Sequence, residues 1–145
     1  MPEFDDSLVS AATPLDVWRI LYDPLRFAEW WSGFDRATSG DARGGDGDVT
    51  LWPAGYPDFA LPQKVDSRAD EHRVVVSCTV SDLCFDWQLE PLAGGTRISV
   101  HVGIPASEAA RESTQREVVS TSLRRLARLA ETGVAPPTDA PPARG

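Results

Sequence analysis

Residues 13–31 read TPLDVWRILYDPLRFAEWW, and this stretch decides how the chain is expected to fold. Thr13 is a favourable N-cap residue and Pro14 a favourable first helical residue, so a helix is predicted to begin here. The dipeptide Asp23-Pro24 is predicted to end that helix, because a residue before proline avoids the helical conformation. A second short helix is then predicted over residues 24–31.

The segments on either side of this stretch read as strands. Residues 8–12 predict a first strand, which begins near Phe4. From residue 34 to residue 104, short apolar runs alternate with turn residues, the pattern of an antiparallel meander. The predicted strands cover 49–52, 61–68, 73–80, 82–90 and 96–104, with a turn at 43–48 that has a strand on each side. The links between the later strands are short enough for hairpins.

Alternation along these runs assigns each side chain to one face of the sheet, because successive strand residues point to opposite sides. On the strand at 82–90, Asp86 and Gln88 face one way and Phe85 and Trp87 the other. His101 is predicted on the outer face. The residues predicted to face inward are Leu83, Phe85, Trp87 and Leu89; Ile98, Val100, Val102 and Ile104; Val74, Val76, Cys78 and Val80; and Gln63 and Ser67.

A long helix is predicted near the C-terminus. Pro105 ends the last strand, Ser107 is an expected N-cap, and a helical pattern runs to Glu131, where Gly133 closes it. An ion pair is expected four residues apart, between Glu112 and Arg116. The apolar stripe of this helix consists of Val119, Leu123, Leu126 and Ala130, with Gln115 and Ser122 at its margin.

The chain has 145 residues, enough for one domain with a single core. We expect that domain to span residues 1–132. Residues 133–145 are rich in proline and lack an apolar period, so they are predicted to be disordered.

Three features together resemble one known superfamily: the helix pair at 13–31, the segments WQLEP (87–91) and GGTRISV (94–100), and the helical pattern after Pro105. They are similar to the SRPBCC superfamily, also called START-like or polyketide cyclase/dehydrase-like, over about residues 5–132. The resemblance implies an α+β helix-grip fold. In that fold a curved antiparallel sheet of about six or seven strands wraps around the long C-terminal helix, with two short helices after the first strand. It also implies an apolar cavity under that helix.

Composition argues against several partners. The 22 acidic residues exceed the 14 basic ones, giving a net charge of −8, which disfavours nucleic acid or an anionic membrane surface. The N-terminus lacks the apolar core of a signal peptide, and no run approaches the roughly 20 apolar residues of a membrane span. We therefore expect a cytoplasmic protein without membrane insertion.

No catalytic or metal-binding motif stands out. The metal-capable side chains His72, His101, Cys78 and Cys84 lack zinc-motif spacing, so no metal and no cofactor is predicted. Alternation also places Cys78 and His101 on opposite faces. Nucleophilic catalysis needs a base beside the nucleophile, and no such arrangement is indicated. No catalytic residue is assigned, and whether the protein is an enzyme stays open.

The resemblance places several segments beside the expected cavity, and their side chains become candidate ligand-binding residues. Aromatic residues pack cores as well as pockets, so core packing is the alternative for the tryptophans. Ser122 has the alternative of bonding within its own helix, and Gln115 that of being solvated. The candidates are Trp30, Trp52, Tyr56, Gln63, Cys78, Phe85, Trp87, Val100, Gln115, Val119, Ser122 and Leu123.

Three functions are compatible with this reasoning. The first is a carrier or sensor of a small hydrophobic molecule, such as a lipid, isoprenoid or polyketide, held in the apolar cavity. The second is a polyketide cyclase or aromatase that uses the same cavity. The third is an interaction module of the chaperone-activator type, for which an exposed apolar patch is expected. The oligomeric state stays open.

Overall fold

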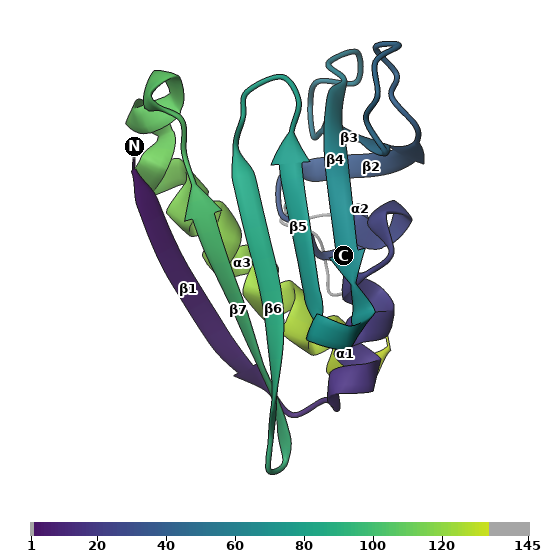
Figure 1. The fold of residues 1–145 in the computed structure, drawn as a ribbon, viewed down its shortest axis with the longest axis vertical. Coiled ribbons are helices and arrows are strands. Elements are labelled where there is room, and N and C mark those ends of the chain that lie inside the picture. Colours follow the sequence, from purple (N-terminus) through teal and green to yellow (C-terminus); the bar gives the residue numbers. More distant parts are fainter. Residues whose placement is uncertain (1, 134–145) are drawn as a thin grey trace, which may run out of the picture.

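The computed structural model describes residues 2–133, and Figure 1 shows their arrangement. The segment predicted to be disordered therefore lies, apart from Gly133, outside the described residues. The strands are β1 (Glu3–Ser10), β2 (Phe34–Ser39), β3 (Val49–Pro53), β4 (Leu61–Arg68), β5 (Arg73–Cys78), β6 (Cys84–Leu92) and β7 (Gly95–Gly103). The helices are α1 (Pro14–Leu21), η1 (Pro24–Arg26), α2 (Phe27–Trp30), η2 (Ala69–Glu71), η3 (Ala106–Arg111) and α3 (Glu112–Thr132).

The seven strands form one antiparallel sheet in the order β1-β7-β6-β5-β4-β3-β2. Helix α3 crosses one face of this curved sheet diagonally, behind the strands in the view of Figure 1. The short helices α1, η1 and α2 follow β1 and lead to the opposite edge of the sheet. This is the helix-grip arrangement that the resemblance implied, and the predicted fold class is confirmed.

The start of the helical segment follows from its sequence. The backbone N–H of Asp16 donates to the Oγ1 of Thr13 at 3.2 Å, so Thr13 is the N-cap of α1, with Pro14 as the first helical residue. The carboxylate of Asp23 accepts a hydrogen bond from the backbone N–H of Leu25 at 3.1 Å. The single helix predicted over residues 24–31 is divided into η1 and the four-residue α2.

The hairpin between β6 and β7 needs glycine for two reasons. Gly94 has a φ of +103°, a conformation that side chains disfavour. A Cβ on Gly95 would lie 2.1 Å from the backbone oxygen of Ser10, so only glycine allows β1 to approach there. The register that results places Trp87 opposite Val100 and Asp86 opposite His101.

Two predicted positions are wrong, and a third residue is on the predicted face but exposed. Strand β5 ends at Cys78, where the N–H of Cys78 donates to the oxygen of Leu83 and closes a turn, so Val80 is 45% exposed. Ser67 pairs with the buried Val74 and so lies on the predicted inner face, but it is exposed near the end of β4. Ser107 does not cap a helix, because η3 begins at Ala106 after Pro105 and the α-helix begins only at Glu112.

The core lies between the inner face of the sheet and the helices. On α3, the predicted stripe residues Val119, Leu123 and Leu126 are fully buried. The expected ion pair on its outer side is present, with Arg116 Nη2 2.8 Å from Glu112 Oε2. Gly133 ends the helix in the left-handed conformation, as predicted. Within residues 2–133, no helix combines the length and apolar character needed to span a membrane.

Helix α3 is fastened to the first strand at its C-terminal end. The carboxylate of Glu131 accepts hydrogen bonds from the hydroxyl of Ser10 at 2.9 Å and from the backbone N–H of Ala11 at 3.0 Å. Farther along the helix, the hydroxyl oxygen of Ser122 accepts the backbone N–H of Ser32 at 2.9 Å. These contacts fix α3 over β1 and beside the end of α2.

Candidate functional site

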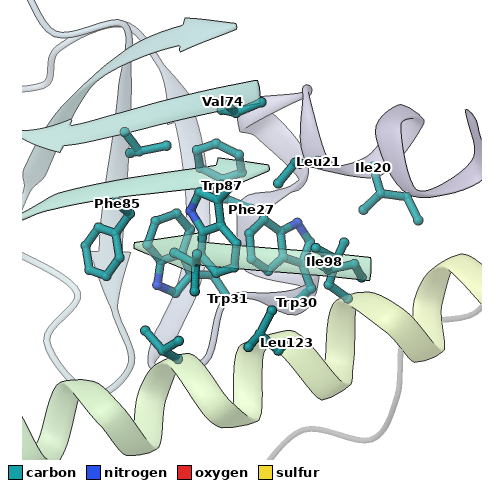
Figure 2. Packing of buried hydrophobic residues seen from close by; sticks show 14 of the residues in the cluster. Ile20, Leu21, Phe27, Trp30, Trp31, Val74, Phe85, Trp87, Ile98 and Leu123 are labelled. Atoms are coloured by element: carbon teal, nitrogen blue, oxygen red, sulfur yellow. The ribbon is translucent and has the colours of Figure 1, made fainter. Parts of the chain in front are cut away.

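Five aromatic side chains meet under α3, and Figure 2 shows four of them, labelled Phe27, Trp30, Trp31 and Trp87, between the strands and the helix, with Phe85 beside them. None of the five is more than 5% exposed. They come from α2, from the residue that follows it, and from β6. We call Phe27, Trp30, Trp31, Phe85 and Trp87 the aromatic cluster.

The rings of the aromatic cluster pack by stacking and by edge-to-face contacts. Trp30 and Trp31 are stacked, with ring centroids 5.4 Å apart. The ring of Trp87 stands nearly perpendicular to both, with its centroid 5.0 Å from that of Trp30 and 5.3 Å from that of Trp31. Phe85 meets Trp31 at 4.8 Å in the same manner. These are favourable geometries for aromatic pairs.

Local sequence explains how the cluster is assembled. In α2, positions 27, 30 and 31 are three and four residues apart, which brings Phe27, Trp30 and Trp31 to one side of the turn. In β6, strand alternation turns Phe85 and Trp87 to the same face. Leu123 of α3 lies on the other side of the rings in Figure 2. The cluster is thus enclosed by the sheet on one side and α3 on the other.

Two polar atoms of the cluster have no hydrogen-bond partner. Trp30 and Trp87 are fully buried, and their Nε1 atoms have no hydrogen-bond partner. Two buried polar side chains among the predicted ligand-binding residues are paired: the hydroxyl of Ser122 donates to the oxygen of Val118 at 2.6 Å, and Gln63 Nε2 donates to the oxygen of Leu61 at 3.1 Å. Buried N–H groups without acceptors are uncommon in folded proteins.

Most of the predicted ligand-binding residues lie on the inner side of the sheet or on the buried side of α3. Gln115 is half-buried near the start of α3. The bond between Ser122 and Val118 matches the alternative of bonding within the helix. The predicted residues that are buried are Trp30, Gln63, Cys78, Phe85, Trp87, Val100, Val119, Ser122 and Leu123.

Two predicted residues do not lie with the others. Trp52 follows the buried Leu51 and is turned the opposite way, where its Nε1 donates to Thr38 Oγ1 at 3.0 Å. The guanidinium carbon of Arg36 lies 4.2 Å from the centre of the Trp52 ring. Tyr56 is 66% exposed in the loop after β3. The expected placement of both beside the core is wrong.

The cluster includes Trp31, which the sequence reasoning did not select. Trp31 contacts four other aromatic rings, those of Phe27, Trp30, Phe85 and Trp87, and it also meets Phe34 at 6.1 Å. The signal that could have found it is the spacing of four residues between Phe27 and Trp31.

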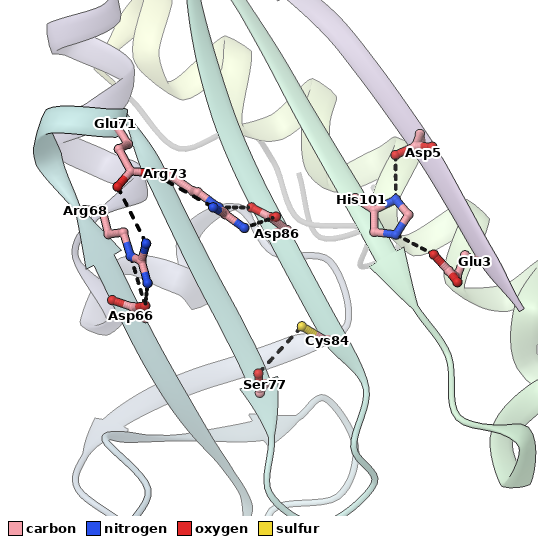
Figure 3. Close-up of polar contacts among 10 residues, drawn as sticks. All are labelled: Glu3, Asp5, Asp66, Arg68, Glu71, Arg73, Ser77, Cys84, Asp86 and His101. Atoms are coloured by element: carbon pink, nitrogen blue, oxygen red, sulfur yellow. Dashed lines mark hydrogen bonds and ion pairs between the residues drawn. The ribbon is translucent and has the colours of Figure 1, made fainter. Parts of the chain in front are cut away.

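Charged groups with shifted pKa values lie on the outer face of the sheet, in loops and in η1. His101 lies between two carboxylates, with Nδ1 2.7 Å from Asp5 Oδ1 and Nε2 2.8 Å from Glu3 Oε1, and these contacts, Asp5 first, raise the pKa of His101 (Figure 3). Beside them, Arg73 Nη2 lies 2.8 Å from Asp86 Oδ2, and the pKa of Arg73 is raised by this hydrogen bond.

Hydrogen bonds also shift pKa values in one loop and in η1. In the loop between β2 and β3, backbone N–H groups, that of Gly47 foremost, lower the pKa of Asp41. The pKa of Arg26 is raised by its hydrogen bonds to Glu29 on α2.

Two open hollows lie away from the aromatic cluster. One, of about 440 Å³, is on the outer face, where Asp5, Asp86 and His101 are among its lining residues. The other, of about 460 Å³, lies beside Trp52 and Phe59. Among residues 2–133, no three His, Cys, Asp or Glu side chains are grouped so that they could hold a metal ion.

Comparison with solved structures supports the fold. The two-domain ARO/CYC protein BexL of the BE-7585A biosynthetic pathway matches with a TM-score of 0.71 and 14% identity over 91% of this chain, which spans only 48% of BexL. XoxI from Bacillus cereus matches with a TM-score of 0.72 and 12% identity, over 91% of this chain and 97% of XoxI. DynU16 of the dynemicin biosynthetic locus matches with a TM-score of 0.64 and 20% identity, over 92% of this chain and 48% of DynU16.

Comparison by sequence identifies the family. No curated protein matches the sequence of this chain. A family described as "Polyketide cyclase / dehydrase and lipid transport" matches residues 1–131, nearly all of the described domain. This match agrees with the helix-grip fold and with the superfamily resemblance in the sequence. The chain therefore belongs to the polyketide cyclase/dehydrase and lipid transport family of SRPBCC proteins.

Proposed function

We propose that this protein binds a small hydrophobic molecule between the inner face of the sheet and α3, as a carrier or sensor. The observation that carries the proposal is the aromatic cluster, five rings enclosed under the helix that SRPBCC proteins use to cover their ligands. Flat aromatic side chains provide large contact areas for apolar ligands. A ligand would bind among these rings, in place of part of their mutual contacts.

The relatives support a ligand of the lipid or polyketide kind. The family description names both polyketide chemistry and lipid transport. BexL and DynU16 are connected by their descriptions with biosynthetic pathways. This chain spans about half the length of either protein. The two proteins therefore support only the class of ligand that we propose, not a particular activity.

The distribution of charge favours binding over catalysis. A cyclase would require groups that move protons beside the ligand, and such groups commonly have shifted pKa values. In the described part of the chain, the groups with shifted pKa values lie on the outer face of the sheet, in η1 or in loops, and none belongs to the aromatic cluster. A polyketide cyclase or aromatase, which the family description favours, remains the second candidate.

We further propose where the ligand enters. Phe34, Leu83 and Val118 are half-buried and pack against the core from three separate segments. Trp31 is buried in contact with Phe34 and Phe85. Movement of Trp31 would admit a ligand, and Gly33, two residues farther along the chain, has a φ of +96°, a conformation that favours glycine.

Titration with 1-N-phenylnaphthylamine, a neutral apolar fluorophore, tests the proposal. We expect saturable binding at one site with energy transfer from tryptophan. Val119→Trp adds a large ring to the buried side of α3 and should abolish that binding. Trp52→Phe is the matched control, because it removes a tryptophan from outside the core and should leave the affinity unchanged. Binding that persists in folded Val119→Trp would refute the proposed site.

A further inference from the structure

We infer that the indole N–H groups of Trp30 and Trp87 donate hydrogen bonds to the ligand, which therefore has neutral acceptor oxygens on an apolar frame. Ketone, ester and quinone carbonyls are acceptors of this class. The inference rests on the proposed function, and it adds to that function the chemistry by which the ligand is selected. It assigns Trp30 and Trp87 as the residues that determine specificity.

The first argument is the pattern of unpaired atoms. Among residues 2–133, the buried side-chain nitrogen and oxygen atoms without partners are Trp30 Nε1, Trp87 Nε1 and Arg125 Nε. All three are N–H donors, so what the interior lacks is acceptors. Burying a donor without an acceptor destabilises a protein, and an acceptor on a bound ligand would remove that cost for both indoles.

The second argument is that the surrounding rings are poor acceptors. Trp30 and Trp87 meet at an interplanar angle of 87°, the edge of one ring against the face of the other. An aromatic face accepts an N–H group more weakly than a carbonyl oxygen does. A ligand carbonyl would therefore gain from replacing such a contact.

The third argument concerns charge. The aromatic cluster contains only Phe and Trp side chains, none of which carries a charge. Placing a carboxylate or phosphate among these rings would require removing its hydration without a counter-charge from the cluster. A neutral oxygen avoids that cost, and the two indoles supply the hydrogen bonds that it loses in leaving water.

Two naphthalenes of nearly equal shape separate this inference from simple hydrophobic binding. 2-Acetylnaphthalene has a carbonyl group where 2-ethylnaphthalene has a methylene group. A wholly apolar site would favour the hydrocarbon, because the ketone must give up its hydration. We expect calorimetry on the full chain to show that the ketone binds at least as tightly as the hydrocarbon.

Conservative variants then identify the donors. Trp87→Phe and Trp30→Phe each retain an aromatic ring but remove one N–H, and each should weaken ketone binding about 2- to 10-fold more than hydrocarbon binding, the usual range for one hydrogen bond. Trp31→Phe is the matched control, since it shortens a ring of the same cluster whose nitrogen is not among the buried unpaired atoms. It should weaken both compounds by the same factor.

A second measurement needs no variant. The infrared carbonyl band of bound 2-acetylnaphthalene should lie at lower wavenumber than that of the compound in hexane, as expected for a hydrogen-bonded ketone. A band at the hexane position, or an equal ketone-to-hydrocarbon affinity ratio in all three variants and the wild type, would overturn the inference while leaving the proposed function intact. Failure of both naphthalenes to bind would refute both.

Discussion

The inner and outer faces of the same sheet differ in how completely their polar groups are paired. On β6, Phe85 and Trp87 face inward and are buried, whereas Asp86 between them faces outward and is held by Arg73 through two hydrogen bonds at 3.0 and 2.8 Å. His101, opposite Asp86 on β7, is likewise held on both sides by carboxylates of β1. The inner face instead encloses two indole N–H groups without partners.

This difference supports the proposal that a ligand binds on the inner face. The charged side chains His101 and Asp86 have partners within the protein, and their interactions join β1 to β7 and β5 to β6 (Figure 3). The rings under α3 have packing partners but incomplete hydrogen bonding. In this protein, the unpaired N–H donors in the core are therefore better evidence for a ligand site than the charged cluster on the outer face.

The largest expected effect concerns the packing of the inner side. Leu126→Ala on α3 should lower the free energy of unfolding by about 2–5 kcal/mol, because it removes methyl groups from a fully buried position. Denaturant unfolding followed by circular dichroism measures the change. Leu25→Ala is the matched control, since Leu25 is 54% exposed and its loss should cost within about 0.5 kcal/mol. Equal midpoints for the two variants would show that α3 does not cover the core as described.

The periodic parts of the sequence predicted most strands, the long helix and much of the core, whereas the superfamily resemblance implied the helix-grip arrangement. Alternation placed Phe85, Trp87 and Val100 correctly because β6 and β7 are nine residues each and pair along their whole length. The capping residue Thr13 and the terminating Gly133 act through local backbone geometry, which sequence alone specifies.

Errors arose where local patterns are short. Strand β3 is only five residues long, and the resemblance places Trp52 beside the cavity, although alternation from Val49 and Leu51 turns Trp52 to the other side of the strand. Tyr56 lies in a loop, where no period constrains the side chain. The missing partners of Trp30 and Trp87 depend on the three-dimensional packing of α2 against β6, so no sequence pattern could show them.

A smaller effect is expected where a polar contact helps to hold α3 on the inner face. Glu131→Ala removes the acceptor of the Ser10 hydroxyl and the Ala11 N–H, and it should lower the free energy of unfolding by about 1–2 kcal/mol. Glu117→Ala, a substitution at an exposed position of the same helix, should change it by less than about 0.5 kcal/mol. If the two glutamate variants unfold alike, packing alone holds α3 and polar pairing at this end contributes nothing.

The smallest effect is a pH dependence that originates on the outer face. The carboxylates of Asp5 and Glu3 raise the pKa of His101 in the folded protein above its value in the unfolded chain, which is about 6.5. The imidazolium therefore stabilises the fold fully below that unfolded value, and the contribution is lost as the pH rises through the folded pKa. Asp86, opposite His101 on β6, has Arg73 as its own partner, so Asp5 and Glu3 dominate.

Since His101 is 45% exposed, solvent screens these pairs, and the contribution should be about 0.2–1 kcal/mol. Unfolding midpoints of wild type and His101→Gln, compared at pH 6 and pH 9, measure it: the wild type should lose its advantage at the higher pH, and less of it should be present in 1 M salt. A difference that stays constant between the two pH values would mean that His101 joins β1 to β7 through packing alone. The order of the strands would then depend on backbone pairing rather than on charge. The outer and inner faces would differ only in how far their side chains are exposed.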